Sequence, residues 1–83
     1  MTEKERGRII AQVTGRLSSV VATHYINLLN QNLPGYQVTA INRIIGECMN
    51  NVYLFTCGMV PKASLLDKVN QDLGILEKLV YSI

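Results

Sequence analysis

The chain has 83 residues, of which 48% are hydrophobic and 17% charged, and its formal net charge is +2. This length allows one domain, residues 1–83, which buries only about 60–65% of the surface that its unfolded form exposes. The small net charge is not enough to indicate a polyanionic partner. The hydrophobic content is more than one small monomer hides, so we expect self-association.

The first predicted helix covers residues 3–31. Its apolar residues recur at steps of three and four, as on one side of an amphipathic helix: Ile10, Val13, Leu17, Val21 and Leu28. Thr2 is placed to cap this helix, with Glu5 as its capping-box partner. The segment NQNLPGY, with its proline and glycine, ends it.

The second predicted helix covers residues 39–57, with Thr39 at its start and Gly58 as its C-terminal stop. Its apolar stripe consists of Ile41, Ile44, Ile45, Cys48, Val52 and Phe55. The end of this segment, VYLFTC, is apolar on all sides. We predict a helix there as well, because a single strand would have no partner in this chain.

The third predicted helix covers residues 61–82. Pro61 suits a first helical turn, and Ser64 with Asp67 offers a capping pair one turn later. A heptad seam follows: Leu66, Val69, Leu73, Leu76, Val80 and Ile83. The charged residues of this last third mix both signs, which is typical of a solvated helix surface.

Short connections make successive helices antiparallel. The sequence therefore predicts an all-α fold: a three-helix unit with a long first helix and antiparallel second and third helices. We expect this unit to merge with a second copy into a larger helical bundle, as a homodimer.

A second track of small residues runs beside the aliphatic stripe of the first helix: Ala11, Gly15, Ser18 and Ala22. Small residues in register allow another backbone to approach closely. That backbone belongs either to another helix of the same chain or to another subunit, and the third possibility is that the track is simply exposed. With Tyr53 and Leu54 from the apolar end of the second helix, these four residues are our predicted interface.

The sequence gives no indication of catalysis. It lacks a nucleophile elbow, a phosphate-binding glycine loop and a paired carboxylate in its centre. His24 lies within the aliphatic stripe, where we expect a buried ring with hydrogen-bonded nitrogens. His24, Cys48 and Cys57 offer at most three metal ligands without paired spacing, so we predict no enzyme activity, no metal and no cofactor.

Two cysteines are too few for a disulfide scaffold. Cys48 lies on a core stripe, whereas Cys57, near a helix end, is the more accessible thiol. Reduced cysteines and the absence of a signal peptide favour the cytoplasm. The longest uncharged run contains several polar residues, so no transmembrane segment is expected.

The segment YQVTAINRIIGE resembles the recognition helix of a helix-turn-helix motif. Asn42 and Arg43 would point outward there, and their side chains suit adenine and guanine edges respectively. The resemblance covers about a dozen residues and implies binding to duplex DNA. The structural alternative is that Asn42 and Arg43 lie on the solvated side of a bundle helix.

Three functional hypotheses follow. The leading one is a small non-enzymatic helical bundle that self-associates and binds another macromolecule, as an adaptor or regulator with an unidentified protein partner. The alternative is a DNA-binding regulator that uses Asn42 and Arg43. The second alternative is a membrane-surface or immunity-type helical bundle, suggested by the uncharged segment CMNNVYLFTCGMVP.

Overall fold

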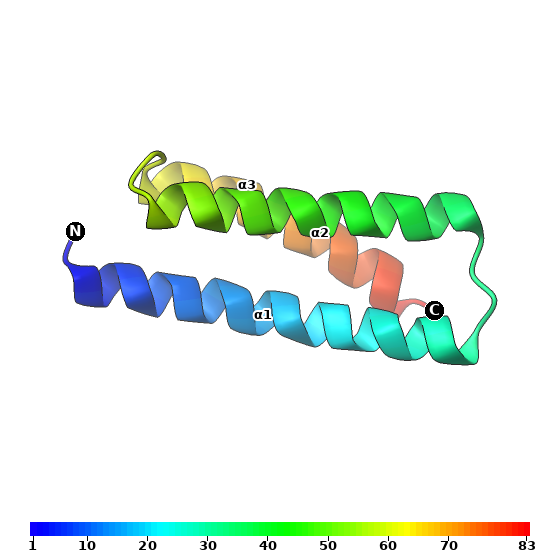
Figure 1. Ribbon diagram of the computed structural model, residues 1–83. Helices are drawn as coiled ribbons and strands as arrows, with labels where there is room; N and C mark the ends of the chain where they lie inside the picture. Colours follow the sequence, from blue (N-terminus) through cyan, green and yellow to red (C-terminus); the bar gives the residue numbers. More distant parts are fainter.

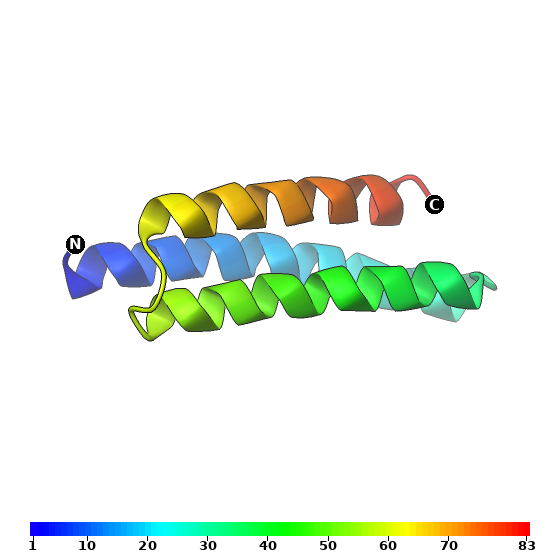
Figure 2. The same cartoon turned by 90° about the horizontal axis from the view of Figure 1, so that it is seen from above.

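The computed structural model describes residues 1–83 as three α-helices without a strand, which confirms the predicted fold class. The helices are α1 (Glu3–Asn30), α2 (Gly35–Thr56) and α3 (Lys62–Tyr81). Each runs antiparallel to the one before it, and together they form an elongated bundle of 44 × 18 × 17 Å (Figures 1 and 2). The beginnings of α1 and α3 and the end of α2 therefore share one end of the bundle.

The start of α1 and its cap by Thr2 agree with the prediction, although the Glu5 side chain makes no return bond to Thr2. The Thr2 hydroxyl oxygen accepts a hydrogen bond from the backbone N–H of Glu5 at 3.1 Å, so Thr2 satisfies one of the free N–H groups of the first turn. At the other end, the backbone N–H of Gln31 donates to the carbonyl of Asn27 at 2.9 Å. The chain then becomes extended before Pro34.

The predicted start of α2 is wrong by four residues, whereas that of α3 is off by one. α2 begins at Gly35, so Thr39 lies inside the helix, and the Pro34 carbonyl accepts the first bonds from Gln37 and Val38. α3 begins at Lys62, directly after Pro61, so Ser64 and Asp67 do not form a starting cap. In both cases a proline, whose ring fixes φ near the helical value, ends the preceding loop and no side chain caps the helix.

Gly58 ends α2 as predicted. Its φ is +74°, a left-handed conformation that favours glycine. The Met59 N–H donates to the Leu54 carbonyl at 2.8 Å, the long bond that closes a Schellman-type helix end. Arg6 of α1 reaches the same point: its guanidinium lies 5.2 Å from the Phe55 ring centroid and donates to the Phe55 carbonyl at 3.4 Å.

The core is one cluster of buried apolar side chains contributed by all three helices: Ile9, Val13, Leu17, Val20, Ile41, Ile44, Cys48, Phe55, Leu65, Val69, Leu73, Leu76 and Val80. α2 and α3 pack together most closely, and α1 packs more closely on α3 than on α2. The buried stripe of α1 is rotated from the predicted one. Val20 and His24 are buried, whereas Val21 is half-buried and Leu28 is 40% exposed.

The left-handed turn at Gly58 leads to a prediction on stability. Gly58→Ala should lower the free energy of unfolding by about 1–2 kcal/mol, because a Cβ is disfavoured at this φ. Chemical denaturation of both proteins measures the difference. Gly46→Ala is the matched control: Gly46 is exposed within α2 and an added Cβ meets no atom within 4 Å, so that change should raise stability by up to about 1 kcal/mol. Equal effects of the two substitutions would contradict this account of the turn.

Candidate functional site

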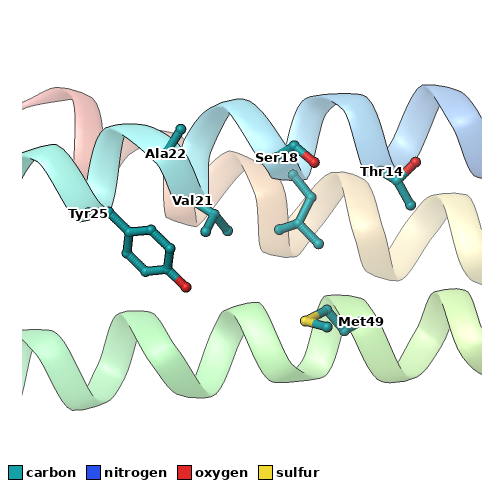
Figure 3. A pocket seen from close by; sticks show the side chains of 7 residues that line it. Thr14, Ser18, Val21, Ala22, Tyr25 and Met49 are labelled. Atoms are coloured by element: carbon teal, nitrogen blue, oxygen red, sulfur yellow. The ribbon is translucent and has the colours of Figure 1, made fainter.

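An apolar groove of about 390 Å³ lies on the side of the bundle where α1 and α2 pack least closely. Its lining comes from six residues of α1 and one of α2: Thr14, Leu17, Ser18, Val21, Ala22, Tyr25 and Met49. In Figure 3 the Tyr25 ring projects from α1 toward α2, and Met49 lies across from Ser18. None of these side chains carries a charge, so the groove suits an apolar surface rather than an ionic ligand.

The small-residue track of α1 forms part of this groove and continues beyond it. Ala11, Gly15, Ser18 and Ala22 are all exposed. A Cβ placed on Gly15 would meet no atom within 4 Å. The alternative in which another helix of the same chain packs on this track is therefore wrong. No contact within the chain explains why these side chains are small.

The predicted interface residues of α2 differ in accessibility. Tyr53 is 63% exposed and follows Met49, itself 59% exposed, by one helical turn. Two residues four apart lie on the same side of a helix, so Tyr53 extends the α2 edge of the groove. Leu54 is half-buried and turns partly toward the interior.

Asn42 and Arg43 are exposed on α2. The Arg43 guanidinium donates to the Glu47 carboxylate one turn later at 3.2 Å, so an acidic partner already offsets its charge. Arg16, the nearest preceding cation in the sequence, instead binds Glu77 at 2.6 Å and Asn70 at 3.1 Å, both on α3. Phosphate binding requires several free cations around a reading helix, and these contacts do not provide such a group.

His24 is fully buried, and neither ring nitrogen has a hydrogen-bond partner. The expectation that its nitrogens would be paired is therefore wrong. Burial lowers the pKa of His24, because the charged imidazolium is disfavoured away from water. Only the Tyr25 ring is a close aromatic neighbour, with its centroid 6.3 Å away.

Asp72 is the one buried carboxylate, although the charges of this region were expected to be solvated. Its Oδ2 atom has no hydrogen-bond partner. Burial raises the pKa of Asp72, and Glu47 raises it further, whereas Lys68 and Arg43 act in the opposite direction. The sequence contained a signal for this position: Leu65, Val69, Asp72 and Leu76 follow one another at heptad steps.

The two cysteines differ as predicted, since Cys48 is buried and Cys57 is exposed. Burial raises the pKa of the Cys48 thiol to about 11, and Asp72 and Glu47 add to the effect. No three or more His, Cys, Asp or Glu residues lie together where they could hold a metal ion. None of the three helices has both the length and the hydropathy needed to cross a bilayer.

Comparison of the chain with known protein families, curated proteins and solved structures finds no match in any of the three. The class of this protein is therefore described from its structure alone. It is a three-helix bundle that is well packed between α2 and α3 and bears an uncharged groove between α1 and α2.

The buried Asp72 leads to a prediction on pH dependence. Its folded-state pKa is raised above its ordinary value of 3.8, so the folded chain holds the carboxyl proton more tightly than the unfolded chain. The carboxyl therefore costs the fold least below pH 3.8 and progressively destabilises it as pH rises through the raised pKa. Asp72→Leu should stabilise the protein at pH 7 by about 1–3 kcal/mol, because it removes an unpaired buried group. The gain should shrink toward acid pH in thermal unfolding, and a gain that is constant with pH would contradict this explanation.

His24→Leu provides a contrast with the opposite pH dependence. The lowered pKa of His24 means that only the unfolded chain gains a proton just below pH 6.5, so the wild-type protein loses stability as pH falls from that value. The leucine variant should lack this loss. The stability gain of His24→Leu over the wild type should therefore grow as pH falls, whereas the gain of Asp72→Leu should shrink. Thermal unfolding across the same pH range measures both gains.

Proposed function

We propose that this protein is a non-enzymatic helical adaptor that self-associates through the open side of α1 and binds another macromolecule through α2. The observation that carries the proposal is the uncharged groove between the two helices, with Tyr25 and Met49 exposed at its edges. A contiguous apolar surface of this kind on a small protein typically marks a protein interaction site.

The exposed surface of the bundle supports self-association. Much of the surface is apolar at the end of α1, where Tyr25, Ile26 and Leu29 are 60%, 55% and 85% exposed. No formal charge lies between Arg16 and Arg43 to keep two such surfaces apart.

The second half of α2 and the turn after it offer a second contact surface, which shares Met49 with the groove. Met49, Tyr53 and Met59 are 59%, 63% and 69% exposed. Tyrosine combines an apolar ring with a hydrogen-bonding tip, and methionine adapts its shape to an irregular surface, so both residue types are common where proteins bind one another. A protein partner with an apolar patch fits this surface better than a polyanion, because no cation lies between Glu47 and Lys62.

The first prediction of this proposal concerns the oligomeric state. Sedimentation equilibrium at micromolar concentration should give the mass of at least two chains, since burial of the groove removes apolar surface from water. Added salt should weaken the association little, because the groove has no charge. A folded protein that remains monomeric at these concentrations would contradict the proposal.

The second prediction concerns the partner surface. A photo-crosslinking amino acid at Tyr53 should give one discrete adduct in the native host, with a mass above that of the crosslinked oligomer. The same amino acid at Tyr81, a 50% exposed tyrosine on α3, is the matched control and should not give this adduct. Identical adduct patterns at both positions would rule out a specific partner site on α2.

A further inference from the structure

We infer that the partner on the open side of α1 is a second copy of this chain, bound with its own α1 antiparallel to the first. The inference rests on the proposed self-association and specifies its geometry. A twofold axis level with Val20 relates the two helices, so each copy offers the same surface to the other.

The docking surface is an exposed heptad seam on α1. Its members follow at alternating steps of four and three: Ala11, Gly15, Ser18, Ala22, Tyr25 and Leu29. All six are exposed, although a seam with this spacing ordinarily packs against another helix. The core stripe of α1 faces α2 and α3, so the seam is a second, uncovered side of the same helix.

Side-chain size along the seam specifies the orientation. The first four residues are small, and the last two are large and strongly exposed, Tyr25 at 60% and Leu29 at 85%. In the antiparallel register, Gly15 faces Tyr25 of the partner subunit and Ala11 faces Leu29 of the partner subunit. Ser18 then faces Ala22 of the partner subunit, next to the axis. Each large side chain thereby meets a small one, as close packing requires.

A parallel arrangement lacks this complementarity. It would set Tyr25 against Tyr25 of the partner subunit and leave a gap beside the paired glycines at position 15. A gap forfeits dispersion contacts, and two bulky side chains at one level hold the helices apart. Gly15 is exposed and an added Cβ would meet no atom within 4 Å, so the Tyr25 ring of the partner subunit can reach the backbone of α1 there.

Charge favours the same orientation. The last turn of α1 contains no basic residue, so its free carbonyl groups are not offset by a cation of the same helix. In the antiparallel register, Arg8 lies opposite Asn32 of the partner subunit, just beyond that helix end. A cation beside the C-terminus of a helix is stabilising. The parallel arrangement would place the two Arg8 side chains together, where they repel each other.

The second copy also covers the groove. Ser18, Ala22 and Tyr25 belong both to the seam and to the groove lining. Contact from Ala11 to Leu29 extends over about 27 Å of helix at 1.5 Å per residue. The partner's α1 therefore lies along the open side of the bundle and removes the seam from water.

Size-swap variants in sedimentation equilibrium test the register. Gly15→Tyr and Tyr25→Ala should each weaken the dimer at least about tenfold, the first by a clash and the second by loss of an anchoring ring. The double variant exchanges large and small positions, so it should dimerise more tightly than either single variant.

Tyr81→Ala is the control and should dimerise like the wild type. Circular dichroism checks folding, which these exposed positions should leave intact. Additive weakening in the double variant would overturn the register.

Disulfide trapping tests the orientation independently. In a Cys57→Ser background, a mixture of Ser18→Cys and Ala22→Cys chains should crosslink to each other faster than either chain crosslinks to itself. Faster self-crosslinking of each variant would show a parallel pair and overturn this inference, while leaving self-association intact. A wild-type chain that stays monomeric would overturn both this inference and the proposed function.

Discussion

The arrangement of this protein depends on one constraint: three helices in 83 residues cover only one side of the longest helix. α2 and α3 pack tightly and bury the stripe of α1 that includes Val13, Leu17 and Val20. The opposite side of α1 is left in water, with the small residues Ala11, Gly15, Ser18 and Ala22 followed by Tyr25 and Leu29. The groove and the proposed self-association both follow from this unequal coverage.

The interior contains two groups that oppose each other in their response to pH. Burial disfavours the charged form of each group, the imidazolium of His24 and the carboxylate of Asp72. Both ring nitrogens of His24 and the Oδ2 atom of Asp72 lack a hydrogen-bond partner inside the bundle. Asp72 lowers the stability of the fold as pH rises above 3.8, and His24 lowers it as pH falls below 6.5, so both groups oppose folding between these two values. Such buried polar groups reduce an already small margin of stability, because a short chain has a thin core.

The sequence alone predicted the number and order of the helices, because the apolar periods are long and the loops contain proline and glycine. Thr2 and Gly58 were also predictable, since each has a local role that depends on a few neighbouring residues. Thr39 was not, because the chain can enter a helix directly after Pro34 without a side-chain cap. The rotation of the α1 stripe depends on how three helices pack together, and no local pattern determines that packing. The burial of Asp72 had a local signal in its heptad spacing from Leu65, Val69 and Leu76, but a carboxylate in such a position is ordinarily solvated.

The polar contacts between helices are distributed unevenly. α1 is joined to α3 near its middle through Arg16 and near its end through the Asn27 amide, which donates to the Val80 carbonyl at 3.0 Å. Between α1 and α2 the only such contact is that of Arg6 with Phe55, at one extremity of the bundle. Widening the space between α1 and α2 thus breaks few directional bonds, and the covalent connection between Asn30 and Gly35 is what holds the two helices together at the opposite end.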